Sequence, residues 1–293
     1  MRLASISFVL FLCTSLGAEA ATVSTTAILT ERPCTDAITE PCTINPYSAL
    51  IFEGGVGVGS LRESFDLPSG SAAFAEVEFD SENISLPVIR TRSQSASNTR
   101  VGSTTGGAIG YTWNGAASTE FALEGAFTFN SSGSNGAYNN EAGESLAGAW
   151  ITLLDADFFP VNGDVGDAFA LVNASCGDAG VIGRSFARSP GAAGALSLSI
   201  SLGNDCAGNP ITLNPGDSFL VGAIAQSFSN RGGFADASNT FVVDLSSSLG
   251  ADVLASLRSD LTPVAIPEIP IPGALWLFAS GLGLIGARFR RSR

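Results

Sequence analysis

Short runs in which apolar and polar residues alternate recur along the chain, and they constrain its fold more than any other feature. The run 196–202 (LSLSISL) keeps a period of two throughout, and 73–80 alternates small or apolar residues with acids. A period of two places alternate side chains on opposite faces of a β-strand, so each run predicts a half-buried strand. Similar runs occupy 108–113, 120–129 and 219–228.

Two further runs and one helix complete the expected elements. Residues 146–154 and 241–245 are mostly apolar without such alternation, which predicts strands that are more fully buried. A helix is expected at 249–257, where leucine and valine side chains share one face, followed by a linker from Asp260. Many short strands without an alternating strand–helix pattern predict an all-β domain, an antiparallel β-sandwich of jelly-roll-like form with one short C-terminal helix.

The first 20 residues have the pattern of a secretory signal peptide. Arg2 is followed by an uncharged apolar stretch and then by Ala18-Glu19-Ala20, which matches a cleavage site after Ala20. A short buried helix or an uncleaved anchor is the alternative interpretation. The pattern predicts that the chain is exported.

The C-terminal end has the composition of a transmembrane helix. Residues 273–287 contain no charged side chain, and four arginines follow at once: Arg288, Arg290, Arg291 and Arg293. Basic residues resist translocation, so this end should stay in the cytoplasm. The apolar run spans roughly 22 Å against a hydrocarbon core of about 30 Å, which suits a temporary anchor. A buried C-terminal helix is the alternative, but it would leave the arginines beside the core without a counterion.

A proline-rich segment precedes the apolar run. Residues 266–273 read IPEIPIPG, in which Pro267, Glu268, Pro270 and Pro272 form the candidate sorting motif. With the WLFASGL sequence and the arginine-rich end, the segment resembles the sorting tail of PEP-CTERM proteins, most closely the subtype with a VPLPA-like sequence. It departs from that pattern by one Ile inserted into Pro-Glu-Pro and by Gly in place of the final Ala.

The resemblance implies an exported protein of a Gram-negative bacterium that is processed by an exosortase, a membrane transpeptidase-like enzyme. It implies a transient anchor in the inner membrane and then a place at the cell surface or outside the cell, often among extracellular polysaccharide. The expected organisation is a signal peptide (1–20), an ectodomain (21–262), a proline-rich linker with the sorting motif (263–272) and a transmembrane helix with an arginine-rich cytoplasmic tail (273–293).

Composition excludes several classes of function. The chain has no histidine, so a Ser-His-Asp triad, a Cys-His dyad and a histidine-ligated zinc site are excluded. Its 14 basic residues are all arginine, and the net charge is −13. Five of these arginines lie in the two end segments, so the ectodomain is more acidic than the whole chain. Such a charge repels phosphate and argues against nucleic-acid binding.

Four cysteines lie in the exported part, namely Cys34, Cys42, Cys176 and Cys206. An even number in an oxidising compartment predicts two disulfides. Proximity in the sequence favours Cys34 with Cys42 and Cys176 with Cys206, because short loops are the easiest to close. A metal site is the competing interpretation, but no two of these cysteines have C-x-x-C spacing.

Acidic residues gather after the apolar run 146–154. Asp155, Asp157, Asp164 and Asp167 lie close together in the sequence, with Asn162 between them. Oxygen ligands of this kind suit Ca²⁺, although their spacing fits no EF-hand. Acids at a strand end that only solvate a turn are the alternative, and no other cofactor is expected.

Aromatic residues could bind sugar rings. Tyr111 and Trp113 share a strand face and are the expected exposed pair, because aromatic faces pack on the apolar surface of sugars. Trp150 lies between Ala149 and Ile151, which predicts a place in the core. Residues 216–218 (GDS) are expected to form a turn rather than an esterase nucleophile, since no histidine base exists.

Two classes of function remain open. The first is a noncatalytic envelope or extracellular-matrix protein whose partners are an exosortase and extracellular polysaccharide, and which binds carbohydrate or acts in a biofilm. The second is a secreted polysaccharide-active hydrolase, a glycoside hydrolase that uses paired carboxylates across a cleft. The sequence offers no way to choose such a pair, and no catalytic residue is identified.

We expect the proline-rich motif and the basic end to control processing. The prolines keep the motif extended and accessible outside the membrane, and the arginines hold the C-terminus in the cytoplasm. Replacing Pro270 and Pro272, or deleting 288–293, should therefore alter processing, as measured by cell fractionation and the mass of the released chain. Unchanged release and membrane association in both variants would refute the prediction.

Overall fold

The computed structural model describes residues 23–34, 49–56, 59–79, 84, 86–132, 145–158, 174–189 and 193–264. The predicted signal peptide, sorting motif and C-terminal membrane helix lie outside these residues. Among the described residues, no helix is long and apolar enough to cross a membrane.

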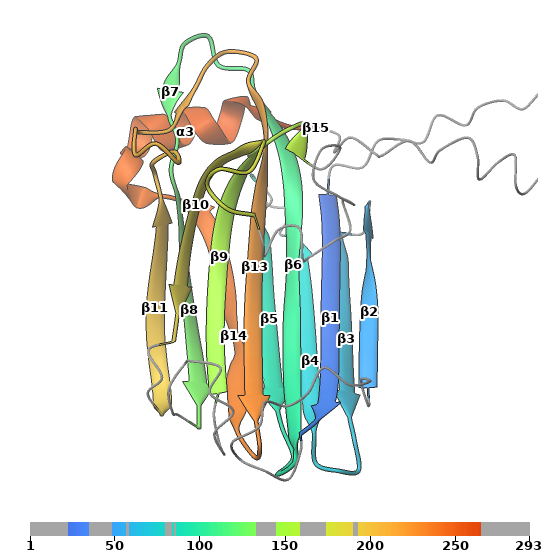
Figure 1. Cartoon of the computed structure of the whole chain (residues 1–293). Coiled ribbons are helices and arrows are strands. Elements are labelled where there is room, and N and C mark those ends of the chain that lie inside the picture. Colours follow the sequence, from blue (N-terminus) through green and yellow to red (C-terminus); the bar gives the residue numbers. More distant parts are fainter. Residues whose placement is uncertain are drawn as a thin grey trace, which may run out of the picture.

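Two antiparallel sheets form a sandwich (Figure 1), as the alternating runs predict. The first sheet has seven strands, in the order β10 (Val181–Arg188), β9 (Ser145–Asp155), β13 (Ser218–Asn230), β6 (Thr99–Trp113), β1 (Val23–Pro33) and β2 (Ala49–Val56), with β15 (Leu261–Val264) also paired to β6. The second has six strands, in the order β11 (Gly194–Leu202), β8 (Leu123–Ser131), β14 (Phe234–Leu245), β5 (Pro87–Gln94), β4 (Ala72–Phe79) and β3 (Ser60–Asp66). A short pair, β7 (Thr119–Glu120) and β12 (Thr212–Leu213), lies at one end.

The strands of the six-stranded sheet follow the predicted alternation. In β4, Ala75 and Val77 are completely buried, and Glu76 between them lies on the opposite face. In β11, Ile200 and Leu202 are buried while Ser201 between them is exposed. One face of this sheet therefore packs in the sandwich and the other faces water.

The central strands of the seven-stranded sheet are more deeply buried than the sequence predicts. The runs 108–113 and 219–228 were expected to be half-exposed, but nearly all of their residues are buried. The cause is a second apolar cluster on the outer face of this sheet, where Phe158 and Ala174 pack against Trp150 of β9. Strand β9 is buried on both faces as predicted.

The run 241–245 is also different from the expectation. It was predicted to be more fully buried, yet Val242 is 45% exposed between the buried Phe241 and Val243. The run lies in β14 of the six-stranded sheet, whose outer face is open. A mostly apolar run therefore does not indicate burial on both faces here.

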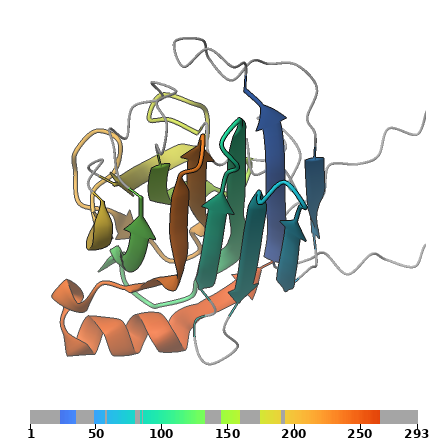
Figure 2. The same ribbon diagram turned by 90° about the horizontal axis from the view of Figure 1, so that it is seen from below.

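A short helix, α3 (Ala251–Asp260), crosses one end of the sandwich after the 3₁₀ turn η1 (Ser247–Leu249) (Figure 2). Leu257 is completely buried in the core, and Val253 and Leu254 pack partly buried against it. This confirms the predicted helix and its apolar face. The chain then returns to the sheet as β15, where a linker was predicted, so Pro263 and Val264 pair with β6.

The interior has two unlike halves. Near α3 it is filled by large side chains such as Trp113, Phe121 and Phe219, which are all buried. Toward the other end, small hydroxyl side chains replace them. There the Ser103 hydroxyl of β6 donates to the backbone oxygen of Phe74 in β4, 2.6 Å away, and thereby joins the two sheets.

Several hydroxyl groups of this polar half are buried without a hydrogen-bond partner within the described part of the chain. They belong to Thr25, Thr91, Ser93, Ser227 and Ser229. A buried hydroxyl that loses its water and gains no partner costs free energy. The polar half therefore contains both a stabilising cross-sheet bond and destabilising unpaired groups.

We predict opposite effects for two substitutions in this half. Thr91→Val keeps the shape of the side chain and removes an unpaired hydroxyl, so the free energy of unfolding should rise by about 1 kcal/mol. Ser103→Ala removes the cross-sheet bond and should lower it by about 1 kcal/mol. Urea unfolding of the two variants measures both effects, and a destabilised Thr91→Val chain would contradict the prediction.

Candidate functional site

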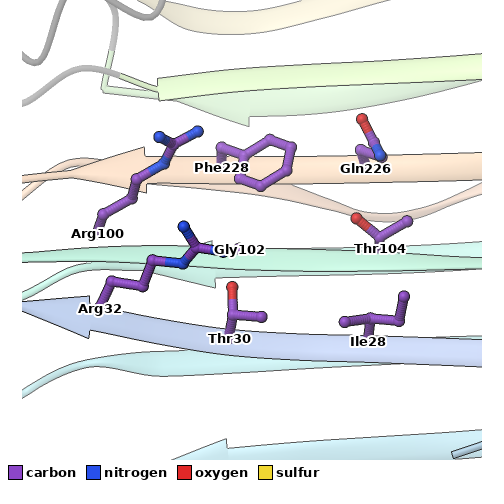
Figure 3. Close-up of a pocket in the computed structure, with 8 residues that line it drawn as sticks. All are labelled: Ile28, Thr30, Arg32, Arg100, Gly102, Thr104, Gln226 and Phe228. Carbon is purple, nitrogen blue, oxygen red and sulfur yellow. The ribbon is translucent and has the colours of Figure 1, made fainter. Parts of the chain in front are cut away.

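A groove crosses the outer face of the seven-stranded sheet where β1, β6 and β13 lie side by side (Figure 3). We call it the outer-face groove, and it has a volume of about 210 Å³. Eight of the described residues line it: Ile28, Thr30, Arg32, Arg100, Gly102, Thr104, Gln226 and Phe228. None of the eight is acidic, although the chain as a whole has a net charge of −13.

The register of the three strands places these side chains in rows across the sheet. Ile28, Thr104 and Gln226 form the first row, since Thr104 pairs with both of the others. The second row contains Thr30, Gly102 and Phe228. The third row begins with Arg32, which pairs directly with Arg100. Figure 3 shows these side chains projecting from one face of the sheet, with both guanidinium groups at one end.

Gly102 makes room for the aromatic ring of the groove. A Cβ atom at this position would lie 2.6 Å from Cε1 of Phe228 and 2.9 Å from Oγ1 of Thr30, which is too close for either contact. The absent side chain therefore lets the Phe228 ring lie beside β6. The guanidinium carbon of Arg100 lies 5.4 Å from the ring centroid, within the range of a cation–π interaction.

The apolar surface continues from the groove to the edge of the sheet. On β2, Phe52 pairs with Ile28 and Leu50 pairs with Thr30, so both lie on the same outer face. They are 53% and 52% exposed. Together with Phe228 they flank the polar side chains of the groove with apolar groups.

A second hollow, of about 480 Å³, lies on the outer face of the six-stranded sheet. Glu124 and Asp244 line it from paired positions on β8 and β14. The carboxylate of Glu124 accepts hydrogen bonds from the Ser246 hydroxyl and from the backbone N–H of Ser247, each at 3.2 Å. These bonds hold the turn that leads into η1, which gives this carboxylate a structural role.

The same outer face carries an arginine held by two acids. Arg90 donates to Glu76 at 2.8 Å and to Glu78 at 3.2 Å. The hydrogen bond with Glu76 is the main cause that raises the pKa of Arg90 above its ordinary value. The acids of β4 are therefore paired with arginine on a wet face of the sheet.

The prediction that Tyr111 and Trp113 form an exposed aromatic pair is wrong. Tyr111 and Trp113 are only 1% and 2% exposed, because they lie on the core face of β6. The Trp113 indole donates to the backbone oxygen of Ala117 at 3.0 Å, and the ring of Tyr111 lies near Phe219. Trp150 is buried as predicted.

The expected calcium ligands are only partly described. Oδ1 of Asp155 accepts a hydrogen bond from the backbone N–H of Asp157 at 3.1 Å, as in a solvated turn. Asp164 and Asp167 lie outside the described residues. Among the residues that the structure describes, no group of three side chains is placed to hold a metal ion. The calcium site stays a prediction.

The predicted turn at 216–218 is present. The carboxylate of Asp217 accepts a hydrogen bond from the backbone N–H of Asn214 at 2.7 Å. Gly216 adopts a φ of 91°, a value that favours glycine. The chain then enters β13 at Ser218, so this segment serves as a turn.

The disulfide between Cys176 and Cys206 is confirmed. Cys34 is buried and also disulfide-bonded. Its predicted partner, Cys42, lies outside the described residues. A disulfide indicates an extracellular or periplasmic protein.

The loop that carries Cys206 is held by its neighbour. The carboxylate of Asp205 accepts hydrogen bonds from Asn209 and from the backbone N–H of Ala207, and the bond from the backbone of Asn209 is the main cause that lowers the pKa of Asp205. Burial lowers the pKa of the nearby Arg184, and the charge of Asp178 opposes this shift.

The residues of the outer-face groove could not be identified from local sequence patterns. Arg32 and Arg100 lie in separate strands, and only the register brings them together. Phe228 ends the run 219–228, but the position of its ring depends on the space left by Gly102 on the neighbouring strand. The single available signal is the presence of arginines in strands of a chain that is otherwise acidic.

Neither a protein-family model nor a curated protein matches the sequence. An aminopeptidase from a marine sediment archaeon, Thaumarchaeota archaeon, aligns with a TM-score of 0.22 and 12% identity over 47% of this chain, and the chain spans only 25% of that protein. A carbohydrate-binding module of the β-sandwich superfamily aligns with a TM-score of 0.22 and 6% identity over 78% of this chain and 95% of the module. Both likenesses are too weak to carry an argument about function.

We predict that Gly102→Ala disturbs the groove. The added methyl group must displace the Phe228 ring, so the free energy of unfolding should fall by about 1–3 kcal/mol. Gly59→Ala is the matched control, because a Cβ there has no neighbour within 4 Å. Urea unfolding measures the difference, and equal stability of the two variants would contradict the prediction.

Proposed function

We propose that this chain is an exported, noncatalytic protein of the cell envelope or extracellular matrix that binds polysaccharide in the outer-face groove. The observation that carries the proposal is the groove itself, in which an aromatic ring, hydrogen-bonding side chains and guanidinium groups project from one face of a sheet. An aromatic ring and hydrogen-bonding side chains suit the apolar faces and the hydroxyl groups of sugars.

The chemistry of the lining suits a sugar chain. The face of an aromatic ring such as Phe228 packs against the apolar face of a sugar ring. Thr30 is partly exposed and offers a hydroxyl group to sugar hydroxyls, and the floor of the groove adds the hydroxyl of Thr104 and the amide of Gln226, which are 5% and 9% exposed. All of them project from β-strands, so the site would be largely formed before the ligand binds.

The proposed location of the protein rests on the disulfide and on the C-terminal sequence. The Cys176–Cys206 bond suggests an oxidising compartment. The proline-rich motif and the arginine-rich end resemble the tail that an exosortase processes, so we propose an exosortase as partner. In this proposal the C-terminal helix anchors a jelly-roll-like ectodomain in the inner membrane until the chain is released to the surface.

The proposed function does not involve hydrolysis. The chain has no histidine to act as a base, and Glu124 of the acidic pair that lines the second hollow is held in a turn. A secreted glycoside hydrolase that uses two other carboxylates is the competing function. The binding experiment can therefore include an assay for new reducing ends.

We predict that Phe228→Ala weakens binding of the full chain to bacterial exopolysaccharides by about tenfold, or about 1.4 kcal/mol. Affinity electrophoresis in gels that contain each polymer measures the effect. Phe186→Ala is the matched control, because Phe186 is 63% exposed on β10, outside the groove lining. Absence of retardation by every polymer would overturn the proposal, as would release of reducing ends that one Asp or Glu substitution abolishes.

A further inference from the structure

We propose that the outer-face groove selects acidic polysaccharides, and specifically binds the carboxylate of a uronic acid between Arg32 and Arg100. This inference rests on the proposed function, because it names the class of sugar that the same groove would take. The two arginines occupy directly paired positions on β1 and β6. Side chains at such positions have Cβ atoms about 4.5–5.5 Å apart, so one carboxylate can reach both guanidinium groups.

Two like charges at paired positions of neighbouring strands repel each other. A carboxylate between them would offset the repulsion through charge-assisted hydrogen bonds. Both arginines have further contacts within the chain. A guanidinium group has five N–H donors, which is enough to keep such a contact and to bind a ligand carboxylate as well.

The neighbouring row provides the rest of a uronate site. Phe228 lies one row from the arginines and is held beside Arg100, with a guanidinium-to-centroid distance of 5.4 Å. A pyranose ring on Phe228 would therefore direct its carboxylate toward the two guanidinium groups. Thr30 of the same row lies on the other side of Gly102 and can bind a sugar hydroxyl.

The surroundings argue for an acidic ligand rather than a neutral one. The described residues that line the groove include two cations and no acid. A neutral polymer would need the aromatic ring and the polar side chains, but not two paired arginines. The planar fork of arginine matches a carboxylate in particular.

The experiment compares polygalacturonate with the same polymer after reduction of its carboxyl groups. The full chain is analysed by affinity electrophoresis at low and at physiological salt. We expect polygalacturonate to retard the chain more strongly, and added salt to reduce this difference. Arg32→Gln with Arg100→Gln should weaken binding of polygalacturonate by about tenfold or more, and binding of the reduced polymer should fall much less.

Two further variants serve as controls. Arg258→Gln removes an exposed arginine on α3, outside the groove lining, and should change neither affinity. Arg100→Lys keeps the charge but loses the planar fork, so it should weaken binding of polygalacturonate selectively even if the double variant does not fold. Circular dichroism checks the fold of each variant.

Each contrary outcome is distinct. Equal retardation by both polymers would overturn the uronate inference and leave the proposed function standing. The same holds if other exopolysaccharides retard the chain and polygalacturonate does not. Tighter binding of a sulfated galactan than of polygalacturonate would assign the groove to sulfate instead. A chain that no polysaccharide retards would overturn the inference together with the proposed function.

Discussion

The close approach of the two sheets is the constraint on which the groove depends. Sheets in a sandwich usually pack about 10 Å apart, with large side chains between them. Here the short side chain of Ser103 reaches the backbone oxygen of Phe74 in the opposite sheet, at 2.6 Å. Only small side chains fit beside such a contact, and Ser227 and Ser229 on the neighbouring strand are indeed small and completely or almost completely buried. The larger groove side chains Arg100 of β6 and Phe228 of β13 lie on the outer face, whereas the medium-sized Val101 of β6 packs between the sheets.

The two halves of the sandwich therefore differ: one holds the large aromatic side chains of the core, and the other carries the outer-face groove. The half near α3 contains the large aromatic residues, such as Trp113 and Phe219, and supplies most of the apolar burial. The other half has unpaired hydroxyl groups inside and a shaped surface outside. Because the well-packed half supports the strands that continue into the other half, the groove can keep polar and charged side chains without a large core beneath it.

The sequence predicts the strands well where one face meets water. The alternation of 196–202 and of 73–80 is retained in β11 and β4, since those strands border solvent on one side. It fails for Tyr111 and Trp113, because period alone does not reveal which face of β6 meets the core. The groove depends on three strands in register and on the space left by Gly102, so no local pattern could reveal it.

The lack of lysine bears on how an acidic protein can bind an acidic polymer. Repulsion between the net charges of the two acts over long distances and is screened beyond about 8 Å at physiological salt. Bidentate bonds from a guanidinium group act at contact and keep their geometry. Arginines on the other sheet, such as Arg62 and Arg90, lie against the acids of β4. Arg32 and Arg100 lie side by side on the outer face of the seven-stranded sheet. Bidentate bonds from this pair would let an acidic polymer bind at short range although the net charge of the chain repels it at long range.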